Sequence, residues 1–380
     1  MDKQILSRRE FFKLGMAAGA TAAVLGAFPK FSLADIKTVS LADCLKMTPE
    51  EMAQKSKLVT DSWKYLLNAA SAIQNQAVRD KVRTALDNPA PTFMTNLTDA
   101  KNRKAVYEEL ISKDLVNKAD IPFDSFLPKT ENPNQSPHPF IAGPGSGYTS
   151  HHAYPGGVVT HTAYNTMVSL SLVENYRQIY GYDLDTDTVL ASQLLHDLLK
   201  PWVFQWSQTG ESRTEMKVGN AGEHHPYSVA ESITRGLPPE VCVAQACAHN
   251  HPGWEKDEKG PVSWIKAACI LTGKDPVKEN LLSPDRKTLP LPRRMENFVC
   301  HLGDHDWVLT VPATRWLLPV IEEIAADKYG MSPADLKGKK FYQFRNFIFS
   351  QATIMTLYHI YSSKGKDELS RTALSMVSPV

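Results

Sequence analysis

The most informative part of this chain is the stretch Val189-Leu190-Ala191-Ser192-Gln193-Leu194-Leu195-His196-Asp197-Leu198-Leu199-Lys200. The residues before His196 are mostly apolar, as in a buried helix, and they lead into a histidine and an aspartate side by side. A charged aspartate in such surroundings is costly unless it is paired or binds a metal. Taken alone, the two residues fit either a hydrogen-bonded pair inside a helical core or part of a metal site.

Other residues of metal-ligand type lie on both sides of this stretch. They are His151, His152 and His161 upstream, and His224, His225, His249, His251, Asp304 and Asp306 downstream. Imidazoles and carboxylates that arrive from successive helices can hold one or two divalent ions, and such ions activate water or bind dioxygen. The sequence therefore predicts a metalloenzyme.

Helical periodicity dominates the chain, and hardly any segment shows the alternation typical of strands. We expect an all-α fold with helices at about 100–115, 158–180, 186–199, 227–236, 239–249, 262–272, 294–309, 314–328, 341–361 and 368–376. Residues 121–148 are rich in Pro, Asn, Gly and Ser, and are expected to form an irregular connector that approaches the site.

The first residues indicate export. Ser7-Arg8-Arg9-Glu10-Phe11-Phe12-Lys13 precedes a run of small and apolar residues that ends before Ser32-Leu33-Ala34. This pattern resembles a twin-arginine signal cleaved near Ala34, and its apolar run is shorter than the ~20 residues that a membrane span needs. We expect a periplasmic or extracellular protein that the twin-arginine export machinery carries already folded, with no membrane span in the mature chain.

Composition restricts the partners. The formal net charge is +1 and no strongly basic face is evident, which argues against a dedicated nucleic-acid binder and favours a small, anionic substrate. Five scattered cysteines are too few for a disulfide scaffold and are expected to be buried thiols. We divide the chain into a signal at 1–34, a helical N-terminal region at 35–130, a metal-binding core at 131–310 and a C-terminal helical extension at 311–380.

His161, the His196-Asp197 pair and the later ligand types follow the order H…HD…H…H…D. The stretch from His196 to Lys200 also looks like an H-D-[IL]-x-K signature. By both features the chain resembles the HD superfamily of metal-dependent phosphohydrolases over about residues 150–307. The resemblance implies an HD-domain helical bundle with extra N- and C-terminal helices. It also implies a two-metal centre that hydrolyses a phosphate ester or a nucleotide.

The resemblance also implies roles for particular residues. The metal ligands it implies are His161, His196, Asp197, His225, His249 and Asp304. The catalytic residues it implies are Asp197 and Lys200, with the Lys200 amine against a phosphate or carboxylate of the substrate.

Three ligand assignments have alternatives, namely His224 for His225, His251 for His249, and Asp275 for Asp304. Asp304 is preferred because Pro276 disfavours a helix at Asp275, whereas the helix at Asp304 is expected to continue through Leu309.

Two other functions fit the same ligand types. The ligand set also resembles that of the di-iron oxygenase branch of the superfamily, which uses dioxygen on a small polar substrate. Residue types do not distinguish Fe, Mn, Ni and Zn. A non-catalytic metal-binding helical module is the third interpretation, although a decayed site would be expected to have lost ligands. The complete ligand set favours a hydrolase with two divalent ions.

Overall fold

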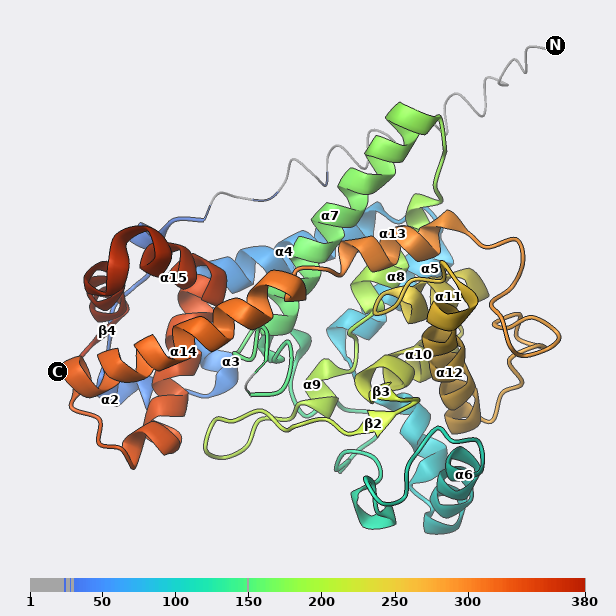
Figure 1. Cartoon of the computed structure of the whole chain (residues 1–380), viewed down its shortest axis with the longest axis horizontal. Coiled ribbons are helices and arrows are strands. Elements are labelled where there is room, and N and C mark those ends of the chain that lie inside the picture. Colours follow the sequence, from blue (N-terminus) through green and yellow to red (C-terminus); the bar gives the residue numbers. More distant parts are fainter. Residues whose placement is uncertain (1–23, 25–27, 29–30, 149, 380) are drawn as a thin grey trace.

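The computed structural model describes residues 24, 28, 31–148 and 150–379. In these residues helices dominate and the strands are very short, which confirms the predicted all-α fold (Figure 1). Within the same ranges, none of the helices combines the length and the apolar content required to cross a bilayer. The twin-arginine motif at Ser7–Lys13 lies outside the described residues.

The elements fall into three consecutive groups. The first group comprises η1 (Leu33–Asp35), β1 (Val39–Ser40), α2 (Leu41–Cys44), α3 (Pro49–Lys55), α4 (Lys57–Ala72), α5 (Gln76–Asp87), η2 (Thr92–Leu97), α6 (Ala100–Ser112), η3 (Phe123–Ser125) and η4 (Phe140–Ala142). The second comprises α7 (Gly157–Tyr180), α8 (Thr186–Leu195), α9 (Lys200–Val203), β2 (Lys217–Val218), β3 (Ala221–Gly222), α10 (His224–Thr234), α11 (Pro239–Cys247), α12 (Glu255–Thr272) and α13 (Met295–Gly303). The third comprises α14 (Trp307–Tyr329), η5 (Asp335–Lys337), α15 (Lys339–Met376) and β4 (Val377–Ser378).

Side-chain caps define where the N-terminal helices begin. Thr48 and Glu51 form a reciprocal capping box at α3. At the starts of α4, α5 and α6, backbone N–H groups donate hydrogen bonds to the side chains of Ser56, Asn75 and Asp99. Each cap satisfies donors that have no partner inside the helix. The polar residues between the apolar runs therefore set the helix boundaries.

Two large apolar clusters hold the fold together. The first is built from α4 to α12, and the second joins residues 41–52 to α14 and α15. β1 pairs in parallel with β4, so residues 39–40 lie beside the C-terminal end of the described chain, at the left of Figure 1. The C-terminal helices thus pack on the N-terminal region, and the division at 130 and 310 stays a prediction.

Several helices end earlier than the periodicity predicts. The helix expected at 186–199 stops at Leu195, and the one expected at 294–309 stops at Gly303. The prediction that a helix continues through Asp304 is wrong, because Asp304 has φ −94° and ψ 54°. A Cβ atom at Gly303 would lie 2.0 Å from Ser169 Oγ, so only glycine lets the end of α13 pack this closely on α7. Because of that close contact, Asp304 lies next to the side chains of α7.

Candidate metal centre

Side chains from four helix ends or helix faces converge in the interior. His161 lies on α7, the pair His196 and Asp197 follows α8, His249 follows α11, and Asp304 follows α13. The side chains of His161, His196, Asp197 and Asp304 are at most 2% exposed. The structure therefore brings these five predicted ligands together from widely separated parts of the sequence, and the sixth, His225, lies beside His249.

The ligand atoms are spaced as they would be around one ion. His161 Nε2 lies 3.1 Å from both Asp197 Oδ2 and Asp304 Oδ1. His196 Nε2 lies 3.2 Å from Asp197 Oδ2 and 3.3 Å from His161 Nε2. Nitrogen and oxygen ligands bound at about 2.0–2.2 Å are about 3.3–3.6 Å apart around a tetrahedral ion and about 2.8–3.1 Å apart around an octahedral one. This end of the cluster is therefore suited to a divalent cation.

Asp197 faces a second group of histidines with its other oxygen. Asp197 Oδ1 lies 3.4 Å from His249 Nε2 and 3.6 Å from His224 Nε2, and His249 Nε2 lies 3.5 Å from Asp304 Oδ2. Both carboxylates therefore lie between two sets of imidazoles. A carboxylate in this position can bridge two ions.

The structure brings both His224 and His225 to the second group, since their ligand atoms and that of His249 lie within 4.8 Å of one another. His224 Nδ1 lies 2.5 Å from Glu215 Oε2, which leaves its Nε2 facing Asp197. The His225 ring instead stacks on His249 at 3.7 Å, and its Nδ1 has no hydrogen-bond partner among the described residues. A metal-bound histidine commonly donates its other N–H to a carboxylate or carbonyl, and His224 fits this pattern.

The two remaining alternatives lie away from the cluster. Asp275 accepts the backbone N–H groups of Val277 and Lys278 and pairs with Arg286. His251 Nε2 lies 3.8 Å from Asp257, near the surface. Among the described residues, neither of the two belongs to a group of possible ligand atoms that lie within 4.8 Å of one another.

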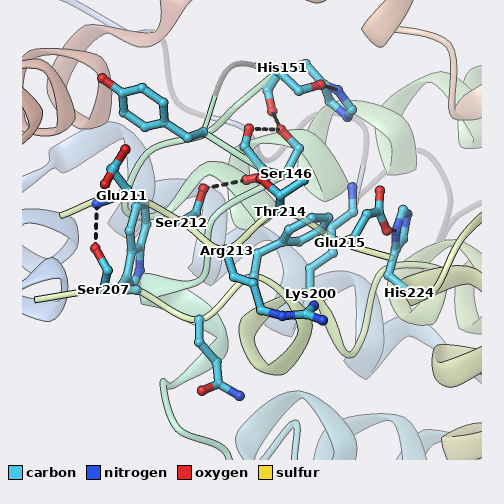
Figure 2. Close-up of a pocket in the computed structure, with 16 residues that line it drawn as sticks. Ser146, His151, Lys200, Ser207, Glu211, Ser212, Arg213, Thr214, Glu215 and His224 are labelled. Carbon is cyan, nitrogen blue, oxygen red and sulfur yellow. Dashed lines mark hydrogen bonds and ion pairs between the residues drawn. The ribbon is translucent and has the colours of Figure 1, made fainter. Parts of the chain in front are cut away.

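Lys200 connects the cluster to an open cavity. Its side chain is 2% exposed, and Nζ lies 2.6 Å from Asp197 Oδ2. The cavity has a volume of about 590 Å³. Its lining residues are Ser146, Gly147, Tyr148, Ser150, His151, Lys200, Phe204, Gln205, Trp206, Ser207, Glu211, Ser212, Arg213, Thr214, Glu215 and His224 (Figure 2). The glycine-rich connector thus forms one wall, and Lys200 and His224 mark the end next to the candidate ligands.

The buried groups of the cluster shift one another's pKa values. Burial opposes ionisation of Asp197, but His196 and Lys200 outweigh it and hold the pKa of the carboxyl group well below its usual value. Burial also lowers the pKa of His225 and of His249, so these rings stay neutral. For His196, burial is outweighed by Asp197 and Asp304, which raise its pKa to about 9. A cation at this position would displace that proton, so metal binding should release protons.

The buried polar atoms also fit a cation. Neither carboxylate oxygen of Asp197 accepts a hydrogen bond of good geometry from the described residues, despite the short Lys200 contact. Buried carboxylates without hydrogen bonds are rare in folded proteins. Imidazole and carboxylate donors suit divalent transition metals. The residues present therefore fit the metal that the resemblance implies.

Several residues near the cluster were not assigned from the sequence. Asp306 Oδ1 lies 2.9 Å from His161 Nδ1, and Asp306 Oδ2 lies 2.7 Å from His152 Nε2. Asn165, one helical turn after His161, donates its amide to Asp304 Oδ1 at 2.8 Å. The i, i+4 spacing on α7 was a usable signal for Asn165. Asp306 stood out in the sequence only as a residue of metal-ligand type close to Asp304, and no pattern gave it a role.

Comparison with known proteins gives a partial match. No protein-family model and no solved structure matches the chain. Over 99 residues the chain is 31% identical to a dihydroneopterin 2′,3′-cyclic phosphate phosphodiesterase of Methanocaldococcus jannaschii. The similar region covers 26% of this chain and 39% of the relative's length. Part of the chain is therefore distantly related to a phosphodiesterase, and the resemblance to the HD superfamily stays a prediction.

Proposed function

We propose that this protein is a metal-dependent phosphohydrolase that acts on a small phosphate ester or nucleotide at a dinuclear centre. One observation carries the proposal: buried imidazoles and carboxylates converge around Asp197, beside a cavity into which Lys200 brings a positive charge. The distant phosphodiesterase relative supports phosphoester chemistry. It matches too little of the chain to specify a substrate.

The proposed ligands divide into two sets. His161, His196 and Asp304 suit one ion, and His249 with His224 or His225 suits the other. Asp197 lies between the sets, as a bridging carboxylate would. Bound divalent ions lower the pKa of a coordinated water and neutralise charge on a phosphate.

The chain's own residues would bind and orient the substrate. The Lys200 amine is fixed by Asp197, so its position is already set when a phosphate oxygen arrives. Tyr148 and Trp206 also line the cavity and provide aromatic surface for the organic part of the substrate. Since the relative is named for a cyclic phosphate, 2′,3′-cyclic phosphates are sensible first substrates to assay.

Hydrolysis assays on metal-loaded protein test this function. We expect purified protein loaded with Mn²⁺, Ni²⁺, Zn²⁺ or Fe²⁺ to hydrolyse bis(p-nitrophenyl) phosphate or a 2′,3′-cyclic nucleotide without oxygen. Asp197→Ala should lose both bound metal and turnover but keep the helical circular dichroism. Metal-loaded protein that turns over only with dioxygen would favour the oxygenase, and protein that binds no metal would contradict the proposal.

We also propose that the protein is exported by the twin-arginine route. The Arg8-Arg9 pair and the small and apolar run that follows support this proposal. Replacing both arginines with lysine should leave unprocessed precursor in the cytoplasm, whereas the unaltered chain should yield a mature form beginning near Asp35. A mature protein that retains residues 1–34 in the cytoplasm would contradict export.

A further inference from the structure

The His161 ring makes contacts at both nitrogens. Its Nε2 faces Asp197 and Asp304 in the proposed metal centre. Its Nδ1 lies 2.9 Å from Asp306 Oδ1, on the side of the ring away from the other ligands. Asp306 directly precedes α14, so this contact joins the C-terminal helices to the centre.

Asp306 is itself held from a second direction. His152 Nε2 lies 2.7 Å from Asp306 Oδ2, and the two side chains are 7% and 8% exposed. His152 Nδ1 lies 2.9 Å from the Tyr154 hydroxyl group, which lies 2.9 Å from Thr160 Oγ1. The connected chain therefore runs from His161 through Asp306 and His152 to Tyr154 and Thr160.

The backbone around His152 is specialised to hold its ring in place. His152 has φ +52°, a conformation that costs energy for a residue with a side chain. Two glycines pack against it. A Cβ atom at Gly157 would lie 1.8 Å from His152 O, and one at Gly145 would lie 2.5 Å from His152 Cβ. Such a conformation persists where the surroundings fix it, so the position of His152 is closely specified.

The directions of the hydrogen bonds to Asp306 determine which tautomer the His161 ring adopts. An ionised carboxylate only accepts hydrogen bonds, so His161 Nδ1 and His152 Nε2 must both donate to Asp306. A neutral His161 then carries its lone pair on Nε2, the atom that faces Asp197 and Asp304. This is the tautomer that a metal requires at that position.

We propose that Asp306 is the positioning residue for the metal ligand His161, and that His152 positions Asp306 in turn. This inference rests on the proposed metal centre and extends it to two residues that bind no metal themselves. Removing such an outer partner typically weakens metal affinity by about 10- to 100-fold. His152 should have a smaller effect, because it acts through Asp306.

Metal affinity of the full-length protein, measured by competition with a chelator, tests the proposal without any substrate. Asp306→Asn should raise the dissociation constant for Zn²⁺ or Co²⁺ by about 10- to 100-fold and alter the visible spectrum of the Co²⁺ form. Asp306→Glu should recover part of the affinity, and His152→Gln should retain more affinity than His152→Leu. Asp275→Asn is the matched control, because Asp275 lies outside the cluster and should leave affinity unchanged.

The outcomes separate this inference from the proposed function. Wild-type affinity in a folded Asp306→Asn variant would overturn the positioning role and leave the metal centre standing. Loss of one whole equivalent of metal would also overturn it, because His152, His161 and Asp306 would then be a metal site of their own. If the wild-type protein binds metal but hydrolyses no phosphoester, the proposed function fails while the affinity comparison still decides the role of Asp306.

Discussion

At the scale of single residues, Lys200 links the proposed ligands to the substrate cavity. We expect Lys200→Gln to lower kcat/KM for a phosphodiester by about 100- to 1,000-fold, the usual cost of removing one preorganised electrostatic contact. Because Lys200 is not itself a ligand in this account, bound metal should be retained. The exposed Lys217→Gln is the control, and an unchanged rate in Lys200→Gln would remove this lysine from the mechanism.

Glu50 gives a prediction on the pH dependence of stability. The hydrogen bond from His138 is the largest effect on its pKa, and it lowers that pKa despite partial burial. A carboxyl group with a lowered pKa in the folded state stabilises the fold above its unfolded pKa, and this contribution is lost as the pH falls through the folded value.

Glu50→Gln should therefore lower the free energy of unfolding by up to about 1 kcal/mol at neutral pH. The difference from wild type should shrink below a pH of about 4.5, the usual value for a glutamate. Urea denaturation at several pH values measures this. A difference that grows as the pH falls would show that the sign is wrong.

Residue patterns predicted much of the candidate site but not all of it. The adjacent pair His196-Asp197 and the order of the later histidines were sufficient to select residues that the structure brings together. The resemblance to the HD superfamily ranked His225 above His224, whereas the Glu215 contact that orients His224 depends on a turn between β2 and β3. Asp306 and His152 are 154 positions apart, and no local pattern connects them.

At the scale of elements, α15 supports the wall of the cavity through Arg345. Its side chain is fully buried and donates Nη2 to Tyr148 O at 2.7 Å. Its guanidinium group lies 4.2 Å from the centre of the Tyr148 ring. Burial lowers the pKa of Arg345 to about 10, which still leaves it charged at neutral pH. A charged group this deeply buried is retained at some cost, so its contact with Tyr148 suggests a role in shaping the cavity.

We expect Arg345→Met to raise KM by about 5- to 30-fold, because a desolvated cation–π contact is worth about 1–2 kcal/mol and Tyr148 lines the cavity. kcat and metal content should change little, since Arg345 is remote from the proposed ligands in the contacts described. Steady-state kinetics with circular dichroism as a check on folding measure the effect. An unchanged KM in a folded variant would show that α15 does not shape the cavity.

Helix existence was easier to predict than helix ends. Apolar periodicity identified α7, α11 and α12 because each buries a continuous apolar face. The helix ends at Leu195 and Gly303 depend on packing against α7 and on the positions of His196 and Asp304 in the cluster. Local helix propensity does not predict such tertiary contacts. The site therefore lies where the helical pattern fails.

At the scale of the whole molecule, the two large apolar clusters enclose four of the five cysteines, and Cys300 is buried as well. Cys44, Cys242, Cys247, Cys269 and Cys300 are buried and free. Burial raises the pKa of Cys44, of Cys269 and of Cys300 to about 12. These observations confirm the predicted buried thiols.

A thiol reagent should therefore react with none of the five cysteines in the native protein at pH 8, because a buried thiol is both inaccessible and protonated. After denaturation in guanidinium chloride all five should react. Mass spectrometry of the labelled protein counts the modified residues. Rapid labelling of Cys44 in the native state would mean that the contact between the N-terminal region and α15 opens readily.

Anomalous X-ray scattering from crystals of the metal-loaded protein shows directly whether the ligands that converge around Asp197 bind metal ions. We expect two peaks about 3.5–4 Å apart. One should lie among His161, His196 and Asp304, and the other beside His249, with Asp197 between them. Metal-loaded crystals with no peak in contact with Asp197, or with ions bound only elsewhere, would contradict the account.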